Sequence, residues 1–376
     1  MTTAPLVRSR AMRMRPRSVL RALLVLVLLL ALGAIACGNG GAASSSKPLV
    51  AVSIFPLYDI AKRVAGDRLE VVCVLPPGKS EHGYEPTPRE MARVSEAKLA
   101  LSVGLEMDAW LERIMRGAAG ENVTIVQLGP RVDPRRVEIH EVGEEAAEEA
   151  AGEHHEEGEH HEAGEHHEAG EQHDEGGQHH EEAGEHHDEG GEHHEEAGEH
   201  HAGGHHHGPI DPHFWLDPQR MSRAVDVMVE SFVRLDPAGA EGFRTRAAAV
   251  KQSLAALDSR IAGRARGWSR KTIVTFHGSF GYYADRYGLT IAAVVEPFPG
   301  REPTPRYLSE VLAAIGTSHA AALFSEPQLD PRPARVISAQ SNVPLFELDP
   351  IGGSGARTSY EALMNANTDV LERALR

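Results

Sequence analysis

Apolar side chains recur at alternating steps of four and three residues along the segment 240–268. The positions are Phe243, Ala247, Val250, Leu254, Leu257 and Ile261. This period predicts a single long amphipathic helix whose charged residues lie on the opposite face. At about 1.5 Å per residue such a helix is roughly 40 Å long, which exceeds the width of a small domain. We therefore expect residues 239–268 to form a rigid helix that joins two lobes.

Short apolar runs alternate with amphipathic segments on both sides of this helix. The runs typical of buried strands are residues 49–55, 69–75, 97–103 and 123–128 before the helix, and 271–276, 289–295, 320–324 and 343–348 after it. Strands that alternate with helices indicate a parallel sheet with helices on both faces. The pattern predicts an α/β fold of two doubly wound four-stranded lobes. The N-terminal lobe comprises residues 48–137 and 209–238, and the C-terminal lobe comprises residues 269–376.

The first residues have the pattern of an export signal. Six arginines among the first 21 residues precede the apolar run 22–32, and small residues then lead to Cys37. A basic start, a short apolar run and small residues before a cleavage point define a signal peptide, and the run is short for a membrane span. We interpret residues 1–36 as the signal peptide, Cys37 as the lipidated cysteine of a bacterial lipoprotein, and residues 37–47 as a flexible tether. Cleavage and secretion without a lipid is the alternative.

Residues 138–208 form a separate compositional block. The formal net charge of the chain is −17, but 25 acidic residues lie between Glu138 and Glu199, where no Lys or Arg occurs. Outside this block and the signal peptide, acids (30) and bases (32) nearly balance, so there is no basic face for nucleic acid.

The same block is rich in histidine. Residues 152–208 hold 18 of the 23 histidines, in units such as Glu-His-His-Glu-Ala-Gly. Because it has few large apolar residues, we expect the block to be a disordered insert. Its paired histidines can capture metal weakly at several sites. A solvated spacer is the alternative.

Four side chains are placed where a ligand binds in such folds. His82 lies in the loop after the second predicted strand, and His213 precedes the helix that leads to the long helix. His277 and Asp349 each directly follow a predicted strand of the C-terminal lobe. Ligands of doubly wound sheets bind beyond the carboxyl ends of the strands. Two of the four residues precede the long helix and two follow it, as a metal site in a cleft between the lobes requires.

Three imidazoles and one carboxylate suit Zn²⁺, which binds nitrogen and oxygen ligands tetrahedrally at about 2.0–2.2 Å. Mn²⁺ would be better served by a second carboxylate in place of one imidazole. A single histidine at a strand end is more often an ordinary loop side chain. Four such residues at matching positions in two lobes favour a metal site.

Four stretches carry a resemblance to a known family. They are Ser80-Glu-His-Gly-Tyr-Glu-Pro-Thr-Pro88, Asp211-Pro-His-Phe-Trp-Leu-Asp-Pro218, Thr275-Phe-His-Gly-Ser-Phe-Gly-Tyr-Tyr-Ala284 and Leu348-Asp-Pro-Ile-Gly352. In their order and spacing the chain resembles the extracytoplasmic zinc-binding proteins of metal ABC importers, the cluster A-I or high-affinity zinc uptake family. The resemblance spans the mature chain, including the long helix and the histidine-rich insert.

The resemblance implies a ligand set. His82, His213 and His277 would bind the metal, with Asp349 or a water in the fourth place. Glu81 is a reserve ligand, because the Glu that precedes the first ligand histidine reaches the metal in some zinc-binding members. Manganese-binding relatives tend to carry Glu at the position of His277, so His277 favours zinc.

The resemblance also implies a function. We expect a binding protein rather than an enzyme, a monomer anchored outside the cytoplasmic membrane through Cys37, that captures Zn²⁺ and passes it to an ABC permease. A manganese-binding relative or an adhesin-type lipoprotein is the alternative. A zinc hydrolase with Glu81 as general base is a further one, but the sequence has no HExxH-type ligand pair. The long helix predicts only slight tilting between the lobes.

Overall fold

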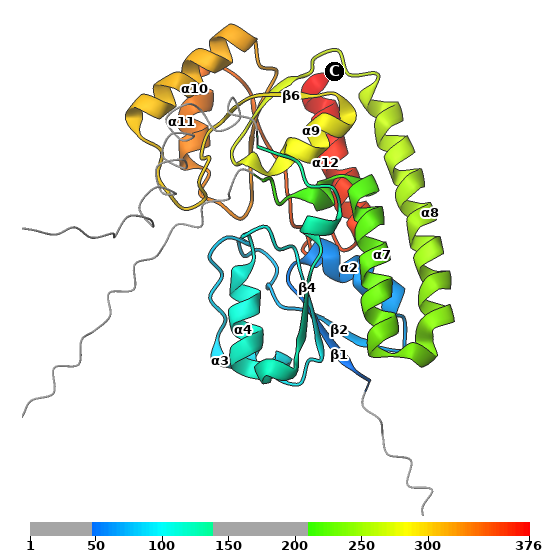
Figure 1. The fold of residues 1–376 in the computed structure, drawn as a ribbon. Helices are drawn as coiled ribbons and strands as arrows, with labels where there is room; N and C mark the ends of the chain where they lie inside the picture. The colour runs from blue at the N-terminus through cyan, green and yellow to red at the C-terminus, as the bar shows by residue number, and fades with distance from the viewer. Residues whose placement is uncertain (1–46, 138–209) are drawn as a thin grey trace, which may run out of the picture. The chain divides into compact units, whose positions relative to one another are not determined.

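The computed structural model describes residues 47–137 and 210–376 (Figure 1). The predicted signal peptide, the predicted lipidation site Cys37, the predicted tether up to residue 46 and the histidine-rich insert lie outside the described residues. From Pro48 onward the described residues belong to one compact unit. In these two segments, we find no helix with the combination of length and apolar character that a membrane span needs.

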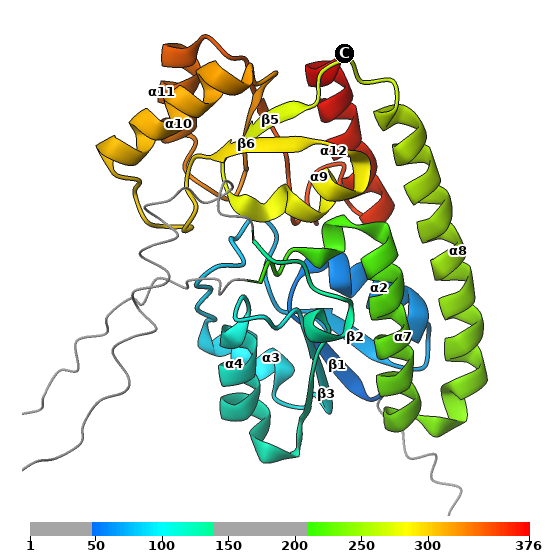
Figure 2. The same ribbon diagram turned by 45° about the horizontal axis from the view of Figure 1, so that its top comes forward.

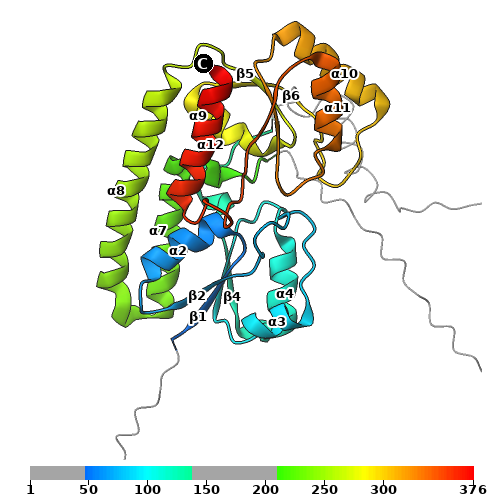
Figure 3. The same cartoon turned by 180° about the vertical axis from the view of Figure 1, so that it is seen from behind.

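Four parallel strands form the first sheet. In chain order the elements are β1 (Leu49–Val52), α2 (Phe55–Ala65), β2 (Glu70–Cys73), α3 (Pro88–Val94), β3 (Leu99–Ser102), α4 (Ala109–Ala119) and β4 (Thr124–Gln127). The strand order is β2-β1-β3-β4. α2 lies on one side of the sheet, whereas α3 and α4 lie on the other (Figure 1 and Figure 3). The order reverses between β1 and β3, and doubly wound folds bind ligands at that switch point.

The second sheet repeats this topology. Its elements are β5 (Thr272–Thr275), α9 (Gly281–Tyr287), β6 (Thr290–Val294), α10 (Pro305–Ser318), β7 (Leu323–Ser325), α11 (Arg332–Ser341), β8 (Leu345–Glu347) and α12 (Tyr360–Leu375). The strands are parallel in the order β6-β5-β7-β8. α10 and α11 cover one face, and α9 and α12 lie on the other (Figure 2). The predicted α/β fold with two four-stranded sheets is confirmed.

Two long helices connect the sheets. α7 (Pro218–Leu235) and α8 (Ala240–Ala265) lie side by side and are joined by a tight turn (Figure 2). α8 buries all six apolar residues whose spacing predicted it, and it packs against α2 of the first lobe and against α9 and α12 of the second. With 26 residues it is about 39 Å long. The predicted connecting helix is therefore confirmed, although it ends three residues early, where the Gly267 amide bonds the Arg264 carbonyl (3.0 Å).

Local sequence sets where several helices begin. Thr87 and Glu90 form a capping box at the start of α3: Thr87 Oγ1 accepts a hydrogen bond from the Glu90 amide (3.4 Å), and the Glu90 carboxylate accepts one from the Thr87 amide (2.8 Å). Thr304 and Ser359 cap α10 and α12 through their hydroxyl oxygens. Short 3₁₀ helices complete the described segments: η1 (Gly120–Asn122), η2 (Gly129–Arg131), η3 (Phe214–Leu216), η4 (Pro237–Gly239) and η5 (Gly278–Phe280).

One apolar core runs through both lobes. It includes Val52 of the first sheet, Trp215 of the connecting segment, Phe243 of α8 and Tyr283 of α9. A second, smaller core lies between the second sheet and the helices α10 and α11. Interiors are packed closely, so relative movement of the lobes would have to break apolar contacts. The shared core and α8 therefore both restrain the motion of one lobe relative to the other.

The two ends of the segment 138–209 leave this body side by side. Arg136 and Ile210 form an antiparallel bridge, and the Asp211 amide donates to the Arg135 carbonyl (2.9 Å). His213 follows this bridge after two residues, so the anchoring of the segment and the position of His213 depend on the same short stretch of backbone.

Candidate metal centre

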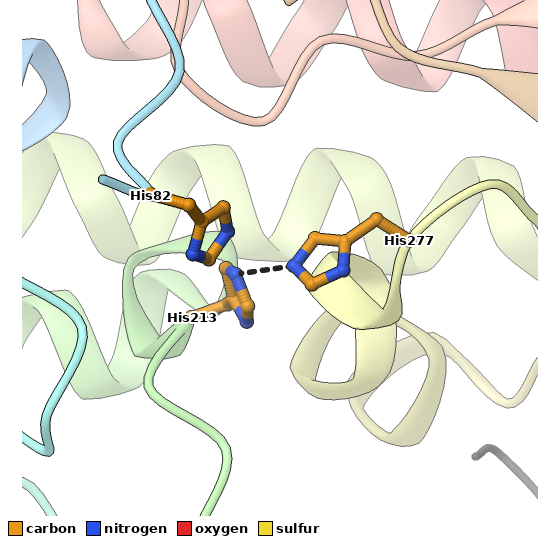
Figure 4. Close-up of side chains that lie close together, drawn as sticks. All are labelled: His82, His213 and His277. Atoms are coloured by element: carbon orange, nitrogen blue, oxygen red, sulfur yellow. Dashed lines mark hydrogen bonds between the residues drawn. The ribbon is translucent and has the colours of Figure 1, made fainter. Parts of the chain in front are cut away.

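Three histidines from separate loops meet between the two sheets (Figure 4). His82 lies in the loop between β2 and α3, and His213 immediately precedes η3. His277 lies between β5 and η5, at the carboxyl end of its strand. Both lobes thus contribute, and all three residues were predicted from the sequence as candidate ligands.

The ring nitrogens of these histidines are close enough to share one ion. The Nε2 atoms of His213 and His277 lie 3.3 Å apart (dashed in Figure 4). One nitrogen from each of the three rings lies within 4.8 Å of the other two. Two ligands at about 2.1 Å from a tetrahedral zinc ion are about 3.4 Å apart. The separation of His213 and His277 matches this value, and the His82 nitrogen lies within 4.8 Å of both.

Asp211 determines which nitrogen of His213 carries the lone pair. The Nδ1 atom lies 2.8 Å from Asp211 Oδ1, which also accepts the backbone amide of His213 (2.9 Å). Asp211 Oδ2 accepts from the Arg135 guanidinium (3.0 Å), which fixes the orientation of the carboxylate. A carboxylate oxygen beside Nδ1 accepts a hydrogen bond from Nδ1–H, so Nε2 carries the lone pair and points to the centre.

Two of the histidines are shielded from water, and one packs against an aromatic ring. His213 and His277 are each 2% exposed. The centroid of the Trp215 ring lies 5.2 Å from that of His213, and Tyr84 and Phe276 are buried as well. A low dielectric strengthens the attraction between a cation and its ligands.

Glu81 is a second buried carboxylate beside the histidines, next to His82. It is 2% exposed, and its Oε1 lies 3.6 Å from His82 Nε2 and has no hydrogen-bond partner among the described residues. Burial raises the pKa of Glu81, the nearby His213 opposes that rise, and the charge of Asp349 adds to it. Glu81 therefore lies within electrostatic range of both the histidines and Asp349.

Asp349 follows β8, as predicted. It does not belong to the group of residues whose possible ligand atoms lie within 4.8 Å of one another, which consists of the three histidines. It is 1% exposed, and its carboxylate contacts the loop that follows it and Arg357. The structure thus brings the three histidines together, places Glu81 beside His82, and leaves Asp349 outside the group.

One buried acid near this centre was missed by the sequence analysis. Glu326 directly follows β7, is 5% exposed, and accepts a hydrogen bond from Ser279 Oγ (2.6 Å). Burial raises its pKa well above the usual value, and the charge of Glu81 adds to the effect. The signal was present: β5, β7 and β8 are neighbours, so an acid directly after β7 lies at the same sheet edge as His277 and Asp349.

Fold and site together define a class of protein. Buried imidazoles contributed by two α/β lobes on a connecting helix are suited to hold an ion, and this arrangement is that of a metal-binding solute-binding protein of an ABC importer. Residues 50–374 match the family described as "Zinc-uptake complex component A periplasmic", and the chain belongs to that family. It is therefore a substrate-binding component of a transporter and not an enzyme, as the sequence predicted.

Relatives of this chain bind different metals. It is 26% identical over 356 residues to the zinc-binding lipoprotein AdcA of Streptococcus pneumoniae serotype 4, covering 93% of this chain and 60% of AdcA. It is 24% identical over 365 residues to the manganese ABC transporter substrate-binding lipoprotein PsaA of Streptococcus pneumoniae, covering 94% of this chain and 97% of PsaA. The chain thus spans less than two thirds of the length of AdcA but nearly all of PsaA.

The fold is shared with a solved structure. The crystal structure of ZnuA superposes with a TM-score of 0.63 at 18% sequence identity, covering 88% of this chain and 99% of that chain. At this identity the likeness establishes the fold. The choice of metal rests on the ligands of this chain.

Proposed function

We propose that this protein captures Zn²⁺ outside the cytoplasmic membrane and delivers it to the permease of an ABC importer. His82, His213 and His277 bind the ion, Asp349 supplies the fourth ligand, and Glu81 is the reserve carboxylate. The observation that carries the proposal is the 3.3 Å separation between the Nε2 atoms of His213 and His277. Two imidazoles from different lobes at that distance suit one tetrahedral ion.

The ligand set supports zinc over manganese. Imidazole suits zinc, whereas carboxylate, carbonyl and water suit manganese. His277 also stands where manganese-binding relatives tend to carry Glu, according to the family resemblance. Because the chain is similar to the manganese-binding PsaA, manganese is the second candidate cargo.

A metal competition titration tests this choice. The full chain, stripped with a chelator, is titrated with Zn²⁺ and with Mn²⁺ against a fluorescent chelator of known affinity for each. Almost any site of this kind binds zinc more tightly than manganese. The size of the difference between the two affinities therefore decides which metal is the cargo. We expect Mn²⁺ to leave the tightest site empty at micromolar concentrations. Full occupancy by micromolar Mn²⁺ would overturn the zinc assignment.

Two variants calibrate that titration. His277→Glu supplies the second carboxylate and should bind Mn²⁺ about ten-fold or more tightly than the wild type does. His319→Asn is the matched control. His319 is exposed at the end of α10 with φ 52°, and asparagine tolerates this left-handed conformation. This variant should keep the wild-type preference.

The histidine-rich insert, which lies outside the described residues, is proposed to collect zinc near the centre. Its paired histidines would bind several ions weakly, since each binding event must order the chain. Deleting residues 144–204 should lower the zinc stoichiometry in calorimetry and leave one tight site. An unchanged stoichiometry would favour the alternative, a solvated spacer. Capture should also fail below about pH 6, where imidazoles protonate.

Location and assembly complete the proposal. Lipidation of Cys37 would hold the monomeric protein at the outer side of the cytoplasmic membrane, with residues 37–47 as its tether. Cys37→Ser should move the protein from the membrane fraction to the soluble fraction. The N-terminal lobe (48–137 and 209–238), the helix 239–268 and the C-terminal lobe (269–376) are proposed as the units that tilt slightly when zinc binds. The permease would then release the ion by disturbing the ligands.

A further inference from the structure

The two oxygens of the Asp349 carboxylate have different surroundings. Oδ1 accepts three hydrogen bonds, from the Ile351 amide (3.0 Å), the Gly352 amide (2.9 Å) and the Gln328 side-chain amide (2.7 Å). A carboxylate oxygen offers about two lone-pair positions. Oδ1 is therefore fully used, and these donors fix the orientation of the carboxylate. Oδ2 is the atom through which Asp349 can meet a metal ion.

Arg357 occupies the space beside Oδ2. Its Nη1 atom lies 3.4 Å from Asp349 Oδ2, and its Nη2 atom lies 3.6 Å from Glu347. Hydrogen bonds from nitrogen to oxygen are about 2.7–3.2 Å long, so Arg357 adds positive charge without directing the carboxylate. Within residues 47–137 and 210–376, Arg357 is the one Lys or Arg that forms an ion pair with Asp349.

The loop that carries Arg357 is fixed by its backbone. Gly352 and Gly353 have φ values of 73° and 79°, and the Gly353 amide donates to the Arg357 carbonyl (2.8 Å). A Cβ at Gly353 would lie 2.9 Å from the ring of Phe55, the first residue of α2 in the other lobe. Close packing against α2 therefore restrains the backbone of this loop, and the Arg357 side chain is 25% exposed.

An ion that takes Asp349 as its fourth ligand would meet Arg357 at the same carboxylate. Because Oδ1 already accepts three hydrogen bonds, such an ion would bind Oδ2, which lies 3.4 Å from Arg357 Nη1. The ion would then share this oxygen with the guanidinium. Two cations that use one carboxylate oxygen repel each other, and in a buried site that repulsion is only partly screened.

We propose that Arg357 sets the affinity and the release rate of the bound ion by competing with it for Oδ2 of Asp349. This rests on the proposed function, with Asp349 as the fourth ligand. Three imidazoles and a carboxylate without a neighbouring cation would hold zinc too tightly for transfer. The positive charge of Arg357 weakens the bond between the ion and Asp349. Arg357 acts through Asp349 and does not touch the ion, so it is a positioning residue that tunes the site.

Replacing the charge tests the proposal. The dissociation rate and affinity for Zn²⁺ are measured on the full chain in a chelator buffer, at free zinc concentrations that fill only the tightest site. We expect Arg357→Gln to bind zinc about ten-fold or more tightly and to release it correspondingly more slowly. Arg357→Lys keeps the charge and should stay close to the wild type. Arg306→Gln, which removes a 78% exposed guanidinium on α10, is the matched control.

The same measurements in an Asp349→Asn background show whether the effect runs through Asp349. There, Arg357→Gln should change the affinity little. Equal or weaker binding by Arg357→Gln in the wild-type background would overturn the proposal, as would equal tightening with and without Asp349. A wild-type protein that takes up no zinc under these conditions would instead remove the proposed function, which keeps the two failures distinct. Thermal unfolding of each metal-free variant identifies any that fail to fold.

Discussion

His213 Nδ1 and Asp211 Oδ1 lie 2.8 Å apart, which makes Asp211 the group that orients this imidazole. Asp211→Asn keeps the shape but removes the negative charge that fixes the Nδ1–H tautomer. We expect zinc affinity to fall by about 10- to 100-fold, the usual effect of losing such a partner. Chelator competition measures the change.

The control for this prediction uses Asp285, which, like Asp211, accepts a hydrogen bond from Arg135. Asp285 accepts from Arg135 Nε (2.7 Å) but is 60% exposed and belongs to α9. Asp285→Asn should leave zinc affinity within about two-fold of the wild type, since surface pairs contribute little. Equal affinities for Asp211→Asn and Asp285→Asn would contradict the role of Asp211.

Asp349 is the proposed fourth ligand, and Glu81 is the reserve carboxylate. If Asp349 binds, Asp349→Asn should weaken zinc binding about ten-fold or more, whereas Glu81→Gln should have a smaller effect. The cobalt-substituted variants give a second measurement, because visible absorption reports the coordination of Co²⁺. A larger loss of affinity in Glu81→Gln would reverse the assignment and make Glu81 the ligand.

Glu326 makes the metal-free protein sensitive to pH. Its folded-state pKa is raised well above the usual value of 4.5, chiefly by burial. At pH values between the two pKa values the folded state binds more protons than the unfolded chain, so the free energy of unfolding falls as pH rises. Glu326→Gln removes this term and can still accept from Ser279. The melting temperature of the variant should therefore exceed that of the wild type by a margin that grows from pH 5 to pH 8.

Circular dichroism with a chelator present measures these melting temperatures. Glu302→Gln, at an exposed position of the same lobe, is the matched control and should keep the wild-type slope. A Glu326→Gln variant whose melting temperature varies with pH as steeply as that of the wild type would count against this account.

Tyr360 connects the two lobes through the segment that carries His213. Its hydroxyl donates to the Trp215 carbonyl (2.6 Å), and Trp215 Nε1 donates to the Pro350 carbonyl (2.8 Å). Tyr360→Phe leaves a buried carbonyl without its donor and should cost about 1–3 kcal/mol of unfolding free energy in a denaturant titration. Tyr58→Phe, whose hydroxyl accepts only an exposed bond from Lys62 (3.3 Å), should cost less than about 0.5 kcal/mol. Similar losses in both variants would show that the contact between the lobes contributes nothing.

Most of the fold could be predicted from the sequence, because periodicity reports which residues are buried. α8 begins at Ala240, one residue after the predicted start, and buries the six apolar residues whose spacing predicted it. Strand ends were less accurate. Ile54 and Phe55 continue the apolar run of β1 but belong to the start of α2, and an apolar run alone cannot distinguish a buried strand from the first turn of a buried helix.

From the sequence, site residues could be predicted only where they lie close to the predicted end of a strand or the start of a helix. The three histidines came together because each lies in a loop beside a carboxyl strand end or a helix start, and Glu326 was missed although it obeys the same rule. The contacts of Asp349 could not be predicted. They depend on the path of the loop through Gly352 and Gly353, both left-handed, and glycine adopts positive φ as readily as negative φ.

The bridge between Arg136 and Ile210 has a consequence for how such a chain can change over time. The cost of closing a loop rises by only about 0.6 kcal/mol for each doubling of its length. With both anchor points paired on the folded body, codons for further histidine repeats can be gained or lost between them with little penalty to folding. If the segment collects zinc as proposed, lineages could thus adjust that capacity to scarcity while the proposed ligands on the folded body stay unaltered.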